Sequence, residues 1–328
     1  MENEVTGHEG LIETLQSQII EIVSIAAPDA SSFSLLDFPD HFNVGDNAIW
    51  LGELAFFRSA FGCNPTYVST KDNVSWSAVE NLPGPIFLHG GGNFGDLWPA
   101  HHHFRESVLD RFPSRPVIQL PQSIHFGDPA ASARTARIIE SHGNFTLLVR
   151  DKQSLEYASK VFDCTVQLCP DMAFCLGPLS RTRSPDIPLL CLLRADKEKA
   201  VADISAGDVL QTDWQVEGWT TRLGRRVVGR FINGSVSSYE RAAHRRVMCG
   251  LDLLSSARVV ISDRLHAHIL CLLLGIPHVA LDNSYGKVSG FIEQWTADSP
   301  IVRRAETLES GLGVAHLMLP QPDVECHG

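Results

Sequence analysis

The stretch from Val259 to Gly290, VVISDRLHAHILCLLLGIPHVALDNSYGKVSG, constrains the fold more than any other part of the chain. Its β-branched run Val259 to Ile261 is typical of a strand buried on both faces of a parallel sheet. Ser262 and Asp263 are expected to supply the N-cap oxygens of the helix that follows. A proline marks the end of this helix, and a second buried strand comes next. The stretch therefore predicts a strand, helix, strand unit.

Two charged side chains occupy the start of the predicted helix. With the cap at Ser262 and Asp263, Arg264 and His266 lie in the first helical turn. In a parallel sheet this turn lies at the carboxyl edge of the strands, where ligands bind and where helix N-termini attract anions. The sequence therefore predicts an anion site that contains an arginine and a histidine.

Further strands, each followed by a helical pattern, predict an α/β fold with a parallel sheet. They are expected at Phe33–Phe38, Thr66–Ser69, Pro85–Leu88, Pro116–Leu120, Phe145–Val149, Cys164–Leu168 and Leu189–Leu193.

A chain of 328 residues is long enough for two domains. The proline-rich run LGPLSRTRSPDIP, residues 176–188, is the best linker candidate. We therefore expect an N-terminal domain at 1–180 and a C-terminal domain at 181–328. The tail from Ser299 onward has no clear motif.

Charge and hydropathy exclude several classes of protein. The net charge of −11 disfavours nucleic acid as a partner, so a bound anion must meet a local basic pocket. No lysine or arginine precedes Arg58, and the longest apolar run, Ile269 to Ile276, is far too short for a membrane span. We expect a soluble, cytoplasmic protein. The eight cysteines form no CxxC pair, which indicates reduced thiols and not a zinc site.

Polar groups follow several of the predicted strands. His89, Gly90, Gly91, Gly92 and Asn93 are expected to form a loop whose bare backbone can approach a ligand closely. A glycine run of this kind is also compatible with a plain turn.

At the start of the helix after the first strand, Asp46 or Asn47 is expected to supply the cap. For Asn43, Asp46 and Asn47, capping alone and substrate contact are both open. The three consecutive histidines at 101–103 point in different directions on a helix, which argues against a metal site.

The remaining strands bring further polar groups to the same edge. These are Gln122, Ser123, His125, Arg150, Asp151 and Asp171. Arg150 and Asp151 are compatible with capping or mutual pairing as well as with ligand contact.

Six motifs in this order resemble the polysaccharide pyruvyl transferase family. They are NVGDNAIWLGE, LHGGGNFGD, IQLPQSIHF, VRDKQS, CPDMAF and SDRLHAHILCLLLGIPHVALDNSYGKVSGF, and they cover about residues 33 to 295. The resemblance implies two Rossmann-like domains facing across a cleft, as in GT-B glycosyltransferases. It also implies transfer of pyruvate from phosphoenolpyruvate to two hydroxyls of a sugar, giving a cyclic ketal and phosphate. The implied role is in exopolysaccharide or cell-surface glycan synthesis. Phosphoenolpyruvate is then a co-substrate, and no metal or other cofactor is expected.

The resemblance assigns Arg264 and His266 to the donor site. We expect His266 to be the general acid or base and Arg264 to hold the donor carboxylate or phosphate. The helix N-terminus and the adjacent arginine disfavour a charged imidazole, so the acid role should depend on the bound polyanionic donor. His268, two positions further on, is expected to be structural. Other expected donor contacts are Arg194, Asn283, Ser284, Tyr285 and Lys287.

By elimination, the acceptor sugar is expected to contact the N-terminal half. The candidate contacts are Asn47, Gly91, Gly92, Asn93, Asp96 and Trp98. Asp46 or Asp96 is the candidate base that activates the attacking hydroxyl. A lipid-linked oligosaccharide is one candidate acceptor, and this would bring transient contact with the inner face of the membrane.

Two other functions remain open from the sequence. A GT-B glycosyltransferase that uses a nucleotide-sugar would share the fold and the anion site, although no acidic pair is placed to hold a ribose. A non-catalytic glycan-binding protein is the second alternative. The retained Arg264, His266, Lys287 and glycine segment argue against it.

Overall fold

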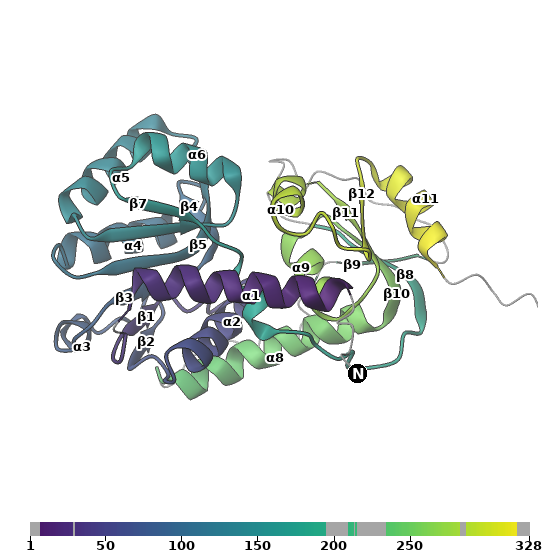
Figure 1. Cartoon of the computed structure of the whole chain (residues 1–328), viewed down its shortest axis with the longest axis horizontal. Coiled ribbons are helices and arrows are strands. Elements are labelled where there is room, and N and C mark those ends of the chain that lie inside the picture. The colour runs from purple at the N-terminus through teal and green to yellow at the C-terminus, as the bar shows by residue number, and fades with distance from the viewer. Residues whose placement is uncertain are drawn as a thin grey trace, which may run out of the picture.

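The chain forms two parallel β-sheets that are connected by helices, as Figure 1 shows. The computed structural model describes residues 7–28, 30–194, 209–212, 214, 234–282 and 287–319. Every strand pair recorded in the two sheets is parallel. The α/β class with parallel sheets expected from the sequence is therefore confirmed.

The first sheet has seven strands in the order β2-β1-β3-β5-β6-β7, with β4 paired to β5. Its strands are β1 (Ser34–Leu36), β2 (Tyr67–Ser69), β3 (Ile86–Leu88), β4 (Gly91–Gly95), β5 (Val117–His125), β6 (Phe145–Val149) and β7 (Thr165–Leu168). The helices of this half are α1 (Gly7–Ala26), α2 (Val44–Ala60), α3 (Trp76–Glu80), α4 (Pro99–Arg111), α5 (Pro129–His142), α6 (Lys152–Val161) and the 3-10 helix η1 (Met172–Leu176).

The second sheet has five strands in the order β12-β11-β10-β8-β9. Its strands are β8 (Ile187–Leu192), β9 (Val209–Thr212), β10 (Ala257–Ser262), β11 (His278–Leu281) and β12 (Val302–Ala305). The helices of this half are α8 (Val236–Ser255), α9 (Leu265–Leu273), α10 (Lys287–Trp295) and α11 (Leu308–Met318). No helix in the described part of the chain is long and apolar enough to cross a bilayer.

Alternating apolar residues bury both faces of each sheet. In the first sheet, Leu35 belongs to the hydrophobic cluster that contains α1 and α2, whereas Leu36 belongs to the cluster of α4, α5 and α6. In the second sheet, Val260 faces α8 and α9, and Ile261 faces α11. Because successive side chains of a strand point to opposite faces, each sheet is the middle layer of three.

One hydrophobic cluster continues from the first sheet to the second. It contains Phe87 and Ile118 from the first sheet, Leu190 and Val260 from the second, and buried residues of the helices between them. Helices α1 and α8 run alongside both halves in Figure 1, and α8 contacts both α2 and β10. Along the chain, the first half ends with η1 at Leu176, and the second sheet begins with β8 at Ile187. The division into two domains near residue 180 stays a prediction, because this core is shared.

One expectation about secondary structure is wrong, and one segment without a sequence motif forms regular structure. The glycine run is not a loop, since Gly91–Gly95 forms β4 and pairs with β5. The chain beyond Ser299, which shows no motif, adds β12 to the edge of the second sheet and then forms α11. In both cases pairing with a distant strand determines the structure, and this pairing leaves no local pattern in the sequence.

The cysteines present no disulfide within the described residues. Seven are free, and of these Cys169, Cys191 and Cys271 are buried. Burial raises the pKa of the Cys191 thiol to about 11. The three buried thiols are therefore protonated at neutral pH and behave as small apolar side chains.

Candidate active site

The start of α9 lies at the carboxyl end of β10 and carries His266 in its first turn. Arg264 itself occupies the N-cap position and makes no side-chain capping bond. The expectation that Ser262 and Asp263 cap this helix is therefore wrong. The Ser262 hydroxyl accepts the N–H of Arg264 at 3.1 Å and donates to the Leu192 carbonyl at 2.6 Å. Ser262 thus connects β10 to β8 at the carboxyl edge.

Asp263 is fully buried beside this turn. Its Oδ1 accepts the backbone N–H of Arg194 at 2.9 Å, whereas its Oδ2 has no hydrogen-bond partner among the described residues. Burial raises the pKa of the Asp263 carboxyl to about 6. Arg194 is thereby fixed through its backbone at the end of β8, and the donor contact expected of its side chain stays a prediction.

Gly45 brings the start of α2 against His266. A Cβ placed on Gly45 would lie 2.4 Å from Nδ1, 2.5 Å from Cγ and 2.8 Å from Cβ of His266. Because these three atoms lie in the plane of the ring, the nearly equal distances place Gly45 above that plane, beside Nδ1 and Cβ of His266. The cap of α2 is Asn43, which accepts the Gly45 N–H at 2.9 Å, so the expectation of a cap at Asp46 or Asn47 is wrong.

A buried network joins the ends of β5 and β6 to η1. Arg150 donates to Asp171 Oδ2 at 2.6 Å and to the Ser123 hydroxyl at 2.9 Å. Asp171 Oδ2 also lies 3.5 Å from His266 Nε2. Burial opposes ionisation of Asp171, but interactions with His266 and Arg150 outweigh it and hold the pKa of this carboxyl well below its ordinary value. Asp171 is therefore a buried anion between the guanidinium of Arg150 and the imidazole of His266.

Asp151 has a different role from Arg150. Its Oδ1 accepts the Ser154 N–H at 2.7 Å and caps α6, and its Oδ2 accepts the Ser123 hydroxyl at 2.7 Å. Of the two readings left open, Asp151 thus follows the capping one. Arg150 instead pairs with Asp171, and its backbone carbonyl accepts the Trp295 indole N–H at 2.8 Å.

Asp46 belongs to the same charged cluster. Its Oδ2 lies 3.5 Å from His41 Nε2, and its Oδ1 lies 3.7 Å from a Cβ placed on Gly91. Burial opposes ionisation, but the charges of His41 and His266 outweigh it and lower the pKa of the Asp46 carboxyl. A carboxylate that is held ionised is a weak base, so it serves better to stabilise positive charge than to take a proton from a hydroxyl.

Gly91 and Gly92 of β4 leave space beside Asp46 and Arg150, because they have no side chains. Arg150 Nη2 would lie only 3.0 Å from a Cβ on Gly92, so the third nitrogen of the guanidinium reaches toward the bare glycine backbone. Gly91 has a φ of 131°, in the region that favours glycine. A side chain at either position would fill the space over which Arg150 and Asp46 converge.

The other expected acceptor contacts are engaged within the protein. The Asn47 side chain is fully buried and donates to the carbonyls of His41 and Asn43 at 3.0 and 2.7 Å. Asn93 Oδ1 accepts from Gln122 at 3.0 Å. Asp96 accepts the N–H groups of Gly127 and Asp128 and fixes the turn before α5. Trp98, at the N-cap position of α4, is 38% exposed. None of these contacts involves His266 or Arg150.

Of the three consecutive histidines, His101 and His102 contact different partners and His103 is exposed, as their helical spacing predicts. His101 Nδ1 lies 2.9 Å from both carboxylate oxygens of Asp37, and His102 Nε2 lies 2.8 Å from the Thr135 hydroxyl. Within the described residues, no group of three or more histidine, cysteine, aspartate or glutamate side chains is arranged to hold a metal ion.

The buried side chains of Glu53 and His89 hold the segment that leads into β4. Glu53 on α2 contacts His89 Nδ1 at 2.9 Å and accepts the Gly90 N–H at 2.8 Å. Burial raises the pKa of the Glu53 carboxyl, although His89 opposes this shift. We did not expect a role for Glu53. A single acidic residue among apolar neighbours, about two helical turns after Asp46 and so on the same face of α2, is the signal that could have found it.

Part of the expected donor cradle lies outside the described residues. This applies to Asn283, Ser284 and Tyr285, and Lys287 is described only as the first residue of α10. Arg264, in contrast, is described and buried, and its guanidinium carbon lies 5.8 Å from the centre of the Trp214 ring.

A buried histidine pair anchors α9 to β11. The carbonyl of Ile276 accepts from His278 Nδ1 at 2.8 Å, so His278 Nε2 is an acceptor in the neutral ring. This Nε2 lies 2.8 Å from His268 Nδ1, and His268 Nε2 lies 2.9 Å from the Thr296 hydroxyl. The expectation that His268 is structural is confirmed.

Replacing His278 by glutamine should reduce the acid sensitivity of the fold. Burial lowers the pKa of His278 to about 4 and that of His268 well below its ordinary value. Between pH 6.5 and 4 the unfolded chain therefore binds protons that the folded chain does not, and stability falls as the pH falls. The shift at His278 corresponds to roughly 3 kcal/mol. The measurement is urea unfolding at pH 7 and pH 4.5, with the exposed His103→Gln as control. An equal acid-induced loss in both variants would contradict this account.

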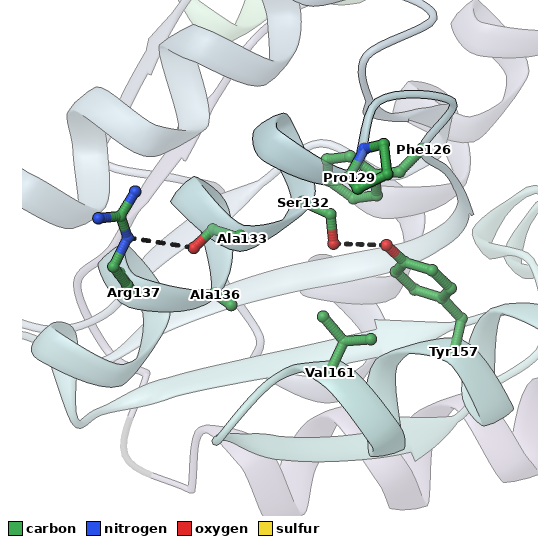
Figure 2. Close-up of a pocket in the computed structure, with 8 residues that line it drawn as sticks. All are labelled: Phe126, Pro129, Ser132, Ala133, Ala136, Arg137, Tyr157 and Val161. Carbon is green, nitrogen blue, oxygen red and sulfur yellow. Dashed lines mark hydrogen bonds between the residues drawn. The ribbon is translucent and has the colours of Figure 1, made fainter.

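An apolar pocket on another face of the first sheet is separate from this cluster. It lies between α5 and α6, and Figure 2 shows Ser132 and Tyr157 hydrogen-bonded to each other across it. None of the residues that line it belongs to the Arg150, Asp171 and His266 network.

Comparison with known proteins identifies the family. Residues 43–285 match the family model described as polysaccharide pyruvyl transferase. The chain is 35% identical over 283 residues to Pyruvyl transferase 1 of Schizosaccharomyces pombe, covering 80% of this chain and 69% of that protein. It is 31% identical over 294 residues to the putative pyruvyl transferase EpsO of Bacillus subtilis, covering 84% and 89%.

A solved structure shares the fold. It is the functionally uncharacterised protein KP1_0663 of Klebsiella pneumoniae, with a TM-score of 0.64, 20% identity, and coverage of 89% of this chain and 99% of that one. At this identity the likeness concerns the fold alone.

The parallel sheets define an α/β protein with a buried charged cluster at the carboxyl edge of its strands. The family match shows that this protein is a transferase. The chain belongs to the polysaccharide pyruvyl transferase family, as its motifs predicted.

Proposed function

We propose that the protein transfers pyruvate from phosphoenolpyruvate to two hydroxyls of one sugar in a polysaccharide or cell-surface glycan unit, forming a cyclic ketal. The observation that carries this proposal is the position of His266, which lies between Gly45 and Asp171 and shares Asp171 with Arg150. Phosphoenolpyruvate has a phosphate, a carboxylate and a carbon that must accept a proton. The cluster offers the guanidinium of Arg150 for the phosphate and the carboxylate, and the imidazole of His266 for the carbon that accepts the proton.

The reaction requires three proton movements. A proton adds to the methylene carbon of phosphoenolpyruvate, and the neighbouring carbon becomes electrophilic. The first sugar hydroxyl attacks this carbon and loses its proton. The second hydroxyl then displaces phosphate and loses its proton in turn. One proton has entered the new methyl group and two have left the hydroxyls, so the balance is completed by the release of hydrogen phosphate.

The described residues divide these tasks. Arg150, whose Nη2 reaches toward Gly92, and Arg264, at the start of α9, bind the anionic donor. His266 delivers the proton to carbon. Asp46 stays ionised and stabilises the positive charge that develops. Residues of the N-terminal half receive the sugar, and no cofactor besides phosphoenolpyruvate is required.

The two sheets support a finer proposal about the fold. We infer two Rossmann-like domains, one for each sheet, that face each other as in GT-B glycosyltransferases. The support is that His266 of the second half meets Gly45 and Asp171 of the first half, so the cluster is incomplete without either one.

The test is an assay of phosphate release from phosphoenolpyruvate with glycosides of galactose, glucose and mannose, combined with mass spectrometry of the acceptor. We expect phosphate release that depends on one acceptor and an acceptor heavier by one pyruvyl ketal. A thermal-shift panel with nucleotide-sugars is run in parallel. Stabilisation by a nucleotide-sugar, with no response to phosphoenolpyruvate, would instead favour a GT-B glycosyltransferase.

Replacing Arg150 by lysine should raise the donor KM by about tenfold or more. Lysine keeps the charge but loses the planar fork that contacts Ser123, Asp171 and the ligand together. The measurement is initial rate against phosphoenolpyruvate concentration. Arg111→Lys is the matched control, because Arg111 forms an exposed pair with Glu80 far from the cluster. Equal KM values for the two variants would remove Arg150 from the donor site.

A further inference from the structure

Asp171 has no role in the steps above, yet it occupies the centre of the cluster. Its carboxylate is fully buried, with Oδ1 accepting the Ala173 N–H at 2.9 Å and Oδ2 accepting from Arg150 at 2.6 Å. The same Oδ2 faces His266 Nε2 at 3.5 Å, across the boundary between the two halves of the chain. The polar atoms of this carboxylate are thus held on three sides before any substrate binds.

The surroundings of His266 distinguish the two nitrogens of its ring. Gly45 packs beside Nδ1 and above the plane of the imidazole, because a Cβ placed on it would be nearly equidistant from the coplanar atoms Nδ1, Cγ and Cβ of His266. Nε2 is buried, whereas the side chain as a whole is 12% exposed. The accessible part of the ring therefore lies on an edge other than that of Nε2. A position above the ring plane does not obstruct the in-plane direction in which Nδ1 gives or takes a proton.

We propose that Asp171 is a positioning residue that keeps the proton of His266 on Nε2 and makes Nδ1 the atom that exchanges protons with the substrates. The kinetic consequences of this proposal rest on the proposed function, whereas the assignment of the proton to Nε2 does not. Nε2 makes no hydrogen bond at 3.5 Å in the structure, and contacts of this kind shorten when substrate binds. A carboxylate that fixes one nitrogen of a histidine determines which nitrogen reacts.

The proton sequence follows from this arrangement. In the imidazolium both nitrogens carry protons, and the Nδ1 proton moves to the methylene carbon of phosphoenolpyruvate. The ring is then neutral, with its remaining proton held on Nε2 by Asp171. The free lone pair of Nδ1 takes the proton of the attacking hydroxyl, which regenerates the imidazolium. One histidine can therefore act first as the acid and then as the base.

The direct test is ¹⁵N NMR of the imidazole nitrogens in the full-length protein. The chain has 14 histidines, so the His266 signals are assigned by their loss in the His266→Gln variant. Above the titration of the ring, we expect a protonated Nε2 and an unprotonated Nδ1 in the wild type. A wild-type ring protonated on Nδ1 would overturn the proposal. This readout needs no turnover, so it stands even if the proposed reaction fails the glycoside assay.

The Asp171→Asn variant gives the kinetic test. The amide has the shape of the carboxyl group but not its charge, and its single oxygen can replace only one of the two carboxylate oxygens that accept from Ala173 and Arg150. We expect kcat to fall about 10²- to 10⁴-fold and the neutral ring to shift toward the form protonated on Nδ1. The limb of the pH profile on which activity falls with rising pH should move down by about one unit. Asp46 on α2, Arg150 after β6 and Arg264 before α9 are unchanged in this variant.

Ser123→Ala separates this role from a structural one. Ser123 contacts Arg150 and Asp151 but not His266, so its loss should raise the donor KM without moving the pH limb or the NMR signals. If Asp171→Asn lowers kcat while both the pH limb and the imidazole signals stay as in the wild type, Asp171 only supports the fold and the proposal is wrong. If that variant does not fold, the wild-type NMR result decides alone.

Discussion

Replacing His266 by glutamine is expected to lower kcat for pyruvyl transfer about 10³-fold while changing phosphoenolpyruvate affinity only a few-fold. Glutamine has similar length and can still contact Asp171, but it cannot protonate carbon. General acid–base catalysis by a positioned side chain typically contributes 10²- to 10⁴-fold. Arg150 and Arg264 remain in place, so the binding of the anionic donor should persist. The loss should therefore appear in kcat and not in KM.

The measurement combines single-turnover phosphate release with titration calorimetry of phosphoenolpyruvate. His316→Gln is the control, because His316 is exposed on α11 and its Nδ1 lies 2.7 Å from the carbonyl of Leu312 in its own helix. Turnover of His266→Gln at the wild-type rate would remove His266 from the mechanism. A loss of donor affinity as large as the loss of kcat would instead indicate that His266 binds the donor.

Much of the fold could be predicted because local patterns agree with it. The strand Phe145–Val149 is found with the predicted bounds, and the unit from Val259 to Leu281 forms β10, α9 and β11. In each, a short β-branched or apolar run is followed by a helix of the right spacing. Local preference and tertiary packing point to the same structure in these segments.

The pairing of charged groups could not be predicted in the same way. Asp171 and His266 are 95 positions apart, and their contact depends on how the two halves of the chain pack together. The sequence indicates Asp171 only as a polar group at the sheet edge, and no spacing in the sequence connects it to Arg150 or to His266. The identity of the caps is similarly decided by fine geometry. Asn43 precedes the residues that we expected to cap α2, and a shift of a few positions at a helix end is beyond the resolution of sequence patterns.

The acceptor side shows a different limit. Asn47, Asn93 and Asp96 have the side chains expected of sugar-binding groups, but each uses its polar atoms to hold neighbouring backbone or side chains. A polar residue after a strand can either bind a ligand or hold neighbouring groups of the protein, and the residue type alone does not distinguish the two roles. The glycines at 91 and 92 are more informative, because they leave space beside Asp46 and Arg150 whatever their own secondary structure.

Replacing Gly45 by alanine is expected to lower kcat about 10²-fold or more, although the residue carries no functional group. The added methyl group would lie 2.4 Å from His266 Nδ1, closer than such atoms approach in proteins, so the ring must move. A displacement of about 1 Å at a reacting group can cost 10²-fold in rate. Alanine is also a better helix former than glycine by roughly 0.5–1 kcal/mol, which offsets part of the strain in α2.

The decisive comparison is the effect of Gly45→Ala in two backgrounds. If the substitution acts by displacing His266, it should lower the rate in the wild type but cost almost nothing further in His266→Gln, where the reacting group is already absent. Gly313→Ala on α11 is the matched control, since a Cβ there meets no atom within 4 Å. Additive losses would show that Gly45→Ala damages the site by another route. A non-additive result would connect the start of α2 to the chemistry at α9, and so would establish that both halves of the chain build one catalytic site.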